Sequence, residues 1–338
     1  MILKGFSHHA ICIILFLSSV LVDFHAQALD SISQNKSTII TYQDAITFRV
    51  AMSDKFNAFK LRSKEDDLSA VIRPNQQINS TFSLQFRFIE IDIGYTPTFI
   101  KFNNDDDKNG KTNFFNLATR FYIKKWIQNL EFTKTKGFFI ESKDFGFAKE
   151  NNIIFPDLKV LKIGGSSAYS FNPNFSFRSI FGQTEWQRKS SGSFVPTISY
   201  YYTQFKDDSN GIDEYIDLVA GPSYFYNWTL TESLMVSGGI YGGIGYSNVH
   251  SSGFKDGTPN STLDGINYRT EITLAIGYNT KKIFTGVMAS FNSFYHNIET
   301  NFRIDDHQQF LEFHIGYRFD APKKMVQIMD IVESKLGI

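Results

Sequence analysis

The sequence is poor in cysteine and has no excess of charge of either sign. Cys12 is its single cysteine, which excludes an internal disulfide and leaves the rest of the chain without a thiol nucleophile or a thiolate metal site. The 34 Lys and Arg residues balance the 34 Asp and Glu residues. This balance gives no electrostatic reason to expect nucleic acid as a partner.

Long apolar runs are missing after the first residues. Lys4 precedes the apolar stretch "AICIILFLSSVLV" (Ala10–Val22), which is too short to span a bilayer, since that takes about 20 residues. The "AQA" at Ala26–Ala28 is a small-residue cleavage site. We therefore predict a signal peptide over residues 1–28 and an exported mature chain, with an uncleaved anchor as the alternative.

Aromatic residues are abundant: 35 Phe and 16 Tyr are more than a soluble domain usually carries, and they suit a lipid boundary. The stretch "FLEFHIGYRF" (Phe310–Phe319) shows their arrangement. Apolar side chains alternate with Glu312, His314 and Arg318 at a period of two, as in a β-strand with one apolar face. In a membrane barrel the apolar face meets lipid and the polar face lines the lumen.

The same alternation recurs along the chain. It is clear in Thr81–Phe88, Ile89–Thr96, Phe115–Ile123, Ser237–Tyr246 and Tyr268–Asn279. Its parity flips between the first two segments, which predicts a tight turn near Arg87–Glu90. An exported chain of such strands indicates an all-β fold, a transmembrane antiparallel up-and-down β-barrel of about 12 strands, in a range of roughly 10 to 14. A soluble all-β protein is the alternative.

The domain organisation follows from where the alternation is strong. We expect the barrel over residues 81–319, with a break in the alternation between Phe171 and Ser193. Residues 29–80 hold two weaker segments, Ile46–Ser53 and Asn57–Ser63. These are either extra wall strands, a periplasmic segment or a plug in the lumen.

The end of the chain carries a different period. Met325, Ile328, Met329, Val332 and Leu336 recur at helical spacing. The spacing predicts a short amphipathic helix within residues 320–338, on the periplasmic side. The helix caps the barrel mouth, lies on the bilayer surface or docks another protein.

The polar strand faces supply the candidate site. Charges inside a barrel need partners, so we expect a hydrogen-bonded network in the lumen that serves the structure. Its expected members are Glu312, His314, Arg318, Arg269, Glu271 and Arg120. Barrel lipases use a His–Ser pair on the outer wall, which requires the two side chains within hydrogen-bond reach. The sequence assigns no catalytic residue.

Metal and cofactor sites have little support. The histidines after residue 28 lack metal-ligand spacing; they are His250, His296, His307 and His314. Asp105, Asp107 and Asn109 fit the first half of a calcium loop, but Asn116 stands at the twelfth position, where the motif requires Glu. A solvated loop is the preferred interpretation. We expect no bound metal and no cofactor.

Several ordered motifs resemble an uncharacterised family of outer-membrane β-barrel proteins, known as a domain of unknown function. They are "IRPN" (Ile72–Asn75), "NGKTNFFNLATRFY" (Asn109–Tyr122), "TKTKGFFIE" (Thr133–Glu141), "FNPNFSFRS" (Phe171–Ser179) and "EWQRKSSGSF" (Glu185–Phe194). The resemblance covers residues 42–319. It implies an outer-membrane barrel and no activity, and it leaves the role of Glu185–Phe194 open.

These observations favour an integral protein of the outer membrane of a Gram-negative bacterium. A channel or transporter for small solutes is the leading functional interpretation. A structural or tethering envelope protein, acting through loops or the C-terminal helix, is the first alternative, and a lipid-modifying barrel enzyme is the second. The expected partners are outer-membrane lipid, the barrel-assembly machinery during insertion, and a periplasmic protein at the C-terminal helix.

Overall fold

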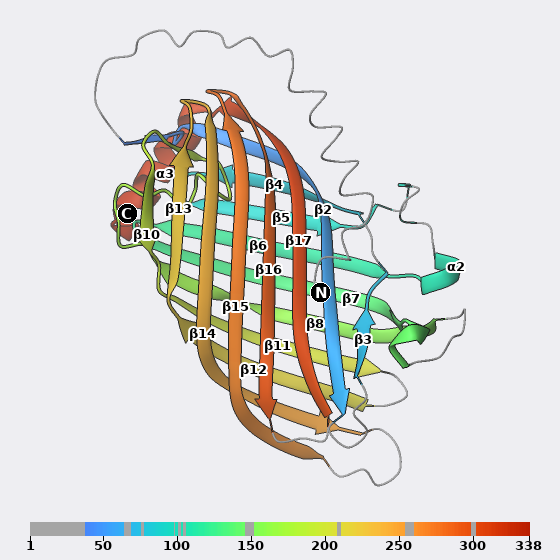
Figure 1. The fold of residues 1–338 in the computed structure, drawn as a ribbon. Coiled ribbons are helices and arrows are strands. Elements are labelled where there is room, and N and C mark those ends of the chain that lie inside the picture. Colours follow the sequence, from blue (N-terminus) through green and yellow to red (C-terminus); the bar gives the residue numbers. More distant parts are fainter. Residues whose placement is uncertain are drawn as a thin grey trace. The chain divides into compact units, whose positions relative to one another are not determined.

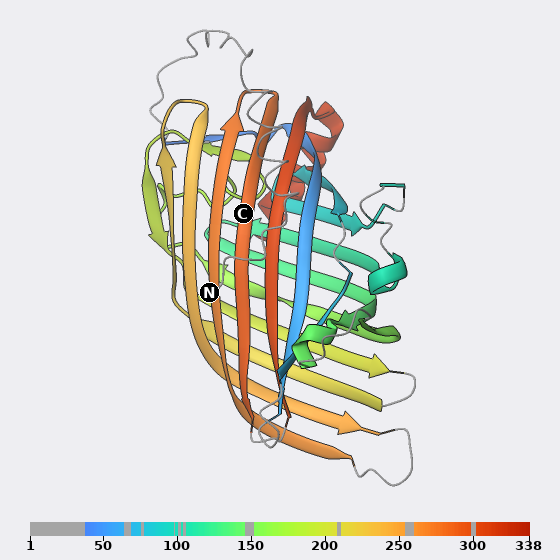
Figure 2. The ribbon, with the colours of Figure 1, turned by 45° about the vertical axis from the view of Figure 1, so that its right-hand side comes forward.

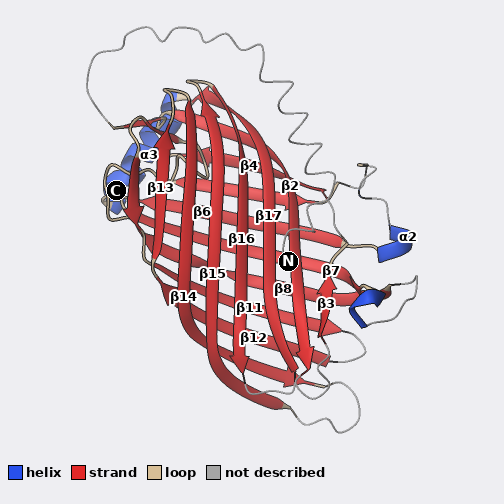
Figure 3. Ribbon diagram, viewed as in Figure 1, coloured by secondary structure: helices blue, strands red, loops and turns tan. Residues whose placement is uncertain are grey.

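The computed structural model describes residues 38–63, 69–75, 78–97, 99–100, 103, 106–145, 152–207, 211–253, 260–298 and 302–338. The predicted signal peptide (residues 1–28) and Cys12 lie outside this part of the chain. Within it, strands predominate over helices (Figure 3). The all-β class expected from the alternating pattern is therefore confirmed.

A single antiparallel sheet closes on itself to form a barrel. Its strands are β2 (Ala45–Ser63), β4 (Ile78–Phe86), β5 (Ile89–Tyr95), β6 (Asn113–Ile123), β7 (Trp126–Ile140), β8 (Ile153–Tyr169), β10 (Ser191–Phe194), β11 (Thr197–Asp207), β12 (Gly211–Gly221), β13 (Ser223–Thr229), β14 (Leu234–Ser252), β15 (Ser261–Asn279), β16 (Ile283–Ile298) and β17 (Phe302–Asp320). β14 pairs with β13 along its first half and with β12 along its second half, so β12 and β13 occupy one position of the ring. β10 pairs with β13 and β11 pairs with β12, so β10 and β11 occupy the next position. The ring thus has twelve positions, as predicted, in the described residues.

The ring is closed by strands that are far apart in the sequence. β2 pairs along its whole length with β17, from Ala45 opposite Asp320 to Ser63 opposite Phe302. On its other side β2 pairs with β4. The weak segments Ile46–Ser53 and Asn57–Ser63, whose place the sequence left open, therefore lie in the wall, which begins at Ala45 and not at the expected boundary of Thr81.

The side-chain alternation sets the two faces of the wall. On β17, Ile315 is 52% exposed on the outside, whereas His314 is 2% exposed on the inside. The same outward apolar face runs around the ring. Its exposed members include Met52, Leu84, Ile93, Leu117, Ile163, Ile216, Ile244, Ile276 and Ile315. Such a band is stable only against an apolar medium, so the outer face is the lipid face of a membrane barrel.

The barrel is formed by two walls whose strands cross. In Figures 1 and 2, β13 to β17 and β2 run steeply across the near wall, and β4 to β8 with β11 and β12 run behind them in another direction. Short turns join strands at one end of the barrel, such as Arg87 and Phe88 between β4 and β5. We call this the short-turn end, and the opposite end the loop end.

The break in alternation between Phe171 and Ser193 is a segment that leaves the wall. Residues 170–190 follow β8 at the short-turn end and fold into the lumen before β10 begins; we call them the plug. They include the short strand β9 (Glu185–Gln187), which pairs with β1 (Ile39–Thr41) just upstream of the barrel. The alternation fails here because the plug lies inside the lumen, where its side chains in more than one direction are surrounded by protein.

Small elements complete the two ends. At the loop end, β3 (Ser69–Arg73) pairs with β2 on one side and with β7 on the other, so it belongs to the sheet and joins these two strands there. The loop end also carries the helical turn α2 (Asp106–Asn109) and the 3-10 turn η2 (Ser142–Phe145). At the short-turn end, the helix α3 (Lys323–Leu336) confirms the predicted C-terminal helix. In the described part of the chain, no helix is both long enough and apolar enough to cross a membrane.

Candidate functional site

The lumen is bridged by an ion pair between opposite walls. Lys162 projects inward from β8 and Asp306 from β17, and these two strands are six positions apart in the ring of twelve. Lys162 Nζ lies 2.8 Å from Asp306 Oδ2, and the two side chains are 10% and 9% exposed. The Lys162 ammonium also lies 4.7 Å from the ring centre of Tyr201 and 5.2 Å from that of Phe294. This ion pair bridges the lumen at this level.

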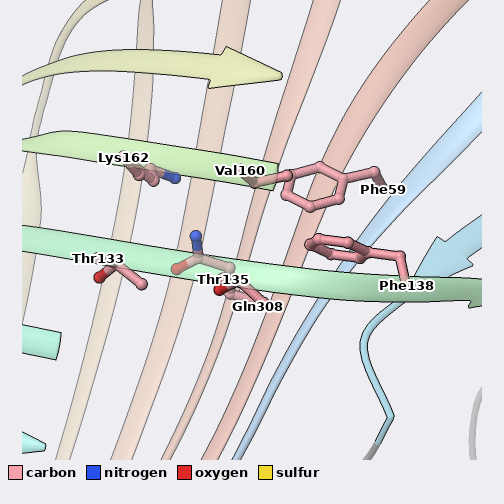
Figure 4. Close-up of a pocket in the computed structure, with 7 residues that line it drawn as sticks. All are labelled: Phe59, Thr133, Thr135, Phe138, Val160, Lys162 and Gln308. Atoms are coloured by element: carbon pink, nitrogen blue, oxygen red, sulfur yellow. The ribbon is translucent and has the colours of Figure 1, made fainter. Parts of the chain in front are cut away.

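Aromatic rings make a second contact across the lumen. Phe59 on β2 packs edge-on against Phe205 on β11, with ring centres 4.8 Å apart, and these two strands are not paired with each other in the sheet. A cavity of about 10 Å³ remains between the walls beside Lys162. Its lining residues are Phe59, Thr133, Thr135, Phe138, Val160, Lys162 and Gln308 (Figure 4). A space of this size holds no more than a water molecule.

A buried arginine organises the charges nearer the plug. The Arg49 guanidinium lies 3.4 Å from Glu90, 3.3 Å from Asp92 and 3.3 Å from Glu312. Arg120 pairs with Glu90 at 2.9 Å, and His314 Nδ1 lies 3.4 Å from Glu312. Arg49 carries one charge against three carboxylates, and Arg120 supplies a second cation. We call Arg49, Glu90, Asp92, Arg120, Glu312 and His314 the Arg49 cluster.

The predicted network residues fall into three groups. Glu312, His314 and Arg120 belong to the Arg49 cluster, with Arg120 linked to Glu312 through Glu90 and Arg49. Arg269 and Glu271 form their own pair on β15 at 2.9 Å, and Arg269 donates to Ser199 and Asn292. Arg318 lies at the short-turn end.

Arg318 connects the wall to the plug. Its guanidinium donates to the carbonyl of Gln183 in the plug and to the carbonyl of Thr280 at 2.8 Å. It also lies 3.7 Å from the ring centre of Tyr42, upstream of β2. Arg318 therefore holds together the plug, a turn between wall strands and the entry to the barrel.

The plug is bonded to several strands around the lumen. Arg49 donates to the carbonyl of Phe181 at 2.9 Å, and Gln183 lies 3.2 Å from His314 Nε2. Asn227 on β13 donates to the carbonyl of Ser176 at 3.0 Å. Arg178 donates to the carbonyl of Tyr122 at 3.1 Å. These bonds reach strands on both walls, so the plug fills the lumen at the short-turn end.

The motif Glu185–Phe194 lies at the end of the plug. The ring of Trp186 is 1% exposed, and its Nε1 donates to the carbonyl of Glu232 at 2.8 Å. Gln187 is fully buried and accepts a bond from Asn227 at 2.9 Å. The sequence left the role of this motif open. In the structure its first half anchors the plug and its second half, Ser191–Phe194, begins a wall strand as β10.

The residues of the calcium hypothesis lie at the loop end. Asp107 and Asn109 are in α2, and Asp105 lies outside the described residues. Asn109 accepts a bond from Asn152 at 2.8 Å and donates to Asn75 at 3.3 Å. In the described ranges, no three His, Cys, Asp or Glu side chains are grouped as metal ligands would be.

Sequence reasoning missed Arg49, Glu90, Asp92, Lys162 and Asp306. The signal for two of them was present, because Glu90 and Asp92 alternate with Ile89, Ile91 and Ile93 in the pattern that marks a lumen-facing set. Lys162 and Asp306 also stand at inward positions. Their pairing depends on the two walls approaching each other, and alternation says nothing about that distance.

The twelve-position ring, its apolar outer face and its polar interior define a transmembrane β-barrel of the outer-membrane type. The chain belongs to the family described as a domain of unknown function (DUF4421), whose model matches residues 36–319. The family resemblance seen in the sequence is thereby confirmed. No curated protein matches the chain.

Solved structures of outer-membrane proteins show a distant likeness. OmpT, an outer membrane protein of Vibrio cholerae, is 6% identical, with 80% of this chain and 97% of that chain covered and a TM-score of 0.34. The translocator domain of the autotransporter NalP from Neisseria meningitidis is 9% identical, with 80% of this chain and 88% of that chain covered and a TM-score of 0.36. The Pseudomonas putida toluene transporter TodX is 7% identical, with 81% of this chain and 89% of that chain covered and a TM-score of 0.28. Likenesses this distant say nothing about the activity of this protein.

Proposed function

We propose that this protein is a closed barrel of the Gram-negative outer membrane that anchors a periplasmic partner through its C-terminal helix. The observation that carries the proposal is the Lys162–Asp306 contact across the lumen. A barrel whose opposite walls touch has no ready path for a solute. Its function is then expected on its outer surfaces and at its ends.

The helix α3 has the properties of a docking element. Arg87 in the β4–β5 turn pairs with Asp330 at 2.8 Å and with Glu333 at 3.0 Å, which holds the helix against the barrel. Four of its apolar side chains stay exposed; they are Met325, Ile328, Ile331 and Leu336. An amphipathic helix fixed on one side and apolar on another suits a groove of a partner protein.

A photo-crosslinking amino acid at Ile331 tests the proposal. We expect a discrete protein adduct in intact cells, and we expect co-purification of the same protein to disappear when Ala321–Ile338 is deleted from a barrel that still folds. Gln327 lies one helical turn before Ile331 on the same face of α3, so the crosslinking amino acid placed there should give the same adduct. Adducts with lipid alone at Ile331 would show that the helix lies on the bilayer, and would reject the tether.

A gated passage for small solutes is the second candidate. The Arg49 cluster favours it, because a purely structural interior could be apolar, whereas buried charges are costly to desolvate. A passage would require the plug to leave its bonds with Arg49 and Arg318, and would require Lys162 to separate from Asp306. The two candidates differ in whether the barrel ever conducts.

A further inference from the structure

A serine and a histidine form a pair on the lipid-facing side of the wall. Ser293 on β16 is directly opposite His307 on β17 in the strand register, and Figure 1 shows these strands side by side. Ser293 Oγ lies 3.0 Å from His307 Nδ1. Both side chains are half-buried. This distance is within the range required of a nucleophile and its general base.

The alternation places the pair on the outside. Phe294 and His296 alternate with Ser293 and Tyr295 along β16. They are 2% and 6% exposed and point into the lumen. Ser293 and Tyr295 therefore point outward, as does the exposed Phe291. On β17, the inward Asp306 precedes His307. The pair is thus separate from the lumen network and from the plug.

Aromatic side chains surround the pair near the loop end. The ring of Tyr295 packs edge-on against the His307 imidazole, with centres 5.5 Å apart, which limits rotation of that imidazole. Tyr268, opposite Tyr295 on β15, is 42% exposed, and Tyr246 on β14 is also exposed. Outward tyrosines at one level mark the boundary between hydrocarbon and head groups. The ester bonds of membrane lipids lie at that boundary.

We infer that Ser293 and His307 form an esterase site that acts on ester-linked acyl chains of membrane lipids. In the tautomer with its proton on Nε2, His307 accepts the Ser293 hydroxyl proton at Nδ1 as Ser293 Oγ attacks the ester carbonyl carbon. The tetrahedral intermediate expels the lipid alcohol, which takes the proton from His307. The products of this step are an acyl-serine and a lipid with one acyl chain fewer.

Water completes the reaction. His307 removes a proton from a water molecule at the head-group boundary, and the resulting hydroxide attacks the acyl-serine carbonyl. The C–O bond to Ser293 breaks, Ser293 Oγ regains the proton from His307, and a fatty acid leaves. No oxidant, reductant or metal enters the balance. This activity is independent of the tethering role of α3, since the two use different surfaces.

The test uses the purified full-length protein in detergent, with heat-modifiable gel migration to show that it is folded. One probe is a fluorophosphonate, which forms an adduct with an activated serine. The other is phosphatidylethanolamine with a fluorescent acyl chain in mixed micelles. We expect an adduct on the peptide that contains Ser293 and release of labelled fatty acid. Ser293→Ala and His307→Gln should each lower the release at least about 100-fold.

Ser290→Ala is the matched control, because Ser290 is on the same strand but points inward and bonds to Glu271 at 3.3 Å. Release by this variant should be unchanged. The inference is overturned if the folded wild-type protein gives neither adduct nor release above buffer, which needs no variant to fold. It is also overturned if both signals survive in Ser293→Ala.

Discussion

Lys162 and Asp306 come from opposite positions of the ring, and their charged groups lie 2.8 Å apart in the middle of the barrel. The contact draws together two walls that a round barrel of this strand number would keep apart. It also leaves each charge dependent on the other, because both are largely shielded from water.

Removing one member of this pair should destabilise the barrel strongly. Lys162→Met leaves the Asp306 carboxylate buried beside aromatic rings, and we expect a loss of about 3–5 kcal/mol in the free energy of unfolding. The double variant Lys162→Met with Asp306→Leu should recover much of that loss. Denaturant unfolding in detergent measures both. Equal stability of wild type and Lys162→Met would show that the pair does not form.

The Arg49 cluster should behave as one coupled unit. Arg49→Met leaves three carboxylates with fewer cations, and should cost about 3–5 kcal/mol in unfolding free energy. Adding Glu312→Gln should restore part of it, since the two sites share one network, with a coupling energy of about 0.5–3 kcal/mol. A strictly additive double variant in the same unfolding experiment would mean that the two residues do not interact.

The plug depends on Trp186. Replacing its fully buried ring by alanine leaves a cavity and should cost about 3–5 kcal/mol, which we expect to appear as protease cleavage within residues 170–190. Trp186→Phe keeps most of the volume but loses the bond from Nε1 to Glu232, and should be milder, at about 1 kcal/mol. If Trp186→Ala left the plug as protected as in the wild type, this anchoring role would be wrong.

The attachment of α3 depends on Arg87. Arg87 has a φ of 54°, which glycine adopts freely, so Arg87→Gly removes the side chain without backbone strain. Lys124→Gly is its matched control, at the same φ in the turn between β6 and β7. We expect trypsin to cleave near Lys323 faster in Arg87→Gly only. Barrel stability should change by less than about 1 kcal/mol, because two of the carboxylates that pair with Arg87, those of Asp44 and Asp330, are more than half exposed to water. Equal cleavage of the two variants would contradict the role of Arg87.

The sequence was sufficient to predict the barrel, its strand number and which face meets lipid, because a period of two reports side-chain direction directly. The same rule puts Glu312 and His314 on one face of their strand, and in the structure their side chains lie 3.4 Å apart. The plug could not be predicted, since its bonds, such as Arg49 to the carbonyl of Phe181, involve backbone atoms that no side-chain pattern describes.

Contacts between distant strands were also out of reach. Lys162 and Asp306 are far apart in the sequence, and their contact depends on how the two walls flatten against each other. The outer pair Ser293 and His307 required the register of β16 and β17, which the unequal connecting segments of the sequence did not fix.

The most direct test of the closed lumen is the conductance of the purified wild-type protein in planar lipid bilayers. Contact between opposite walls at Lys162–Asp306 and Phe59–Phe205 predicts no current steps above background, from protein shown to be folded and inserted. Stable, reproducible steps from the unmodified protein would contradict the account, because they require a water-filled path past these side chains.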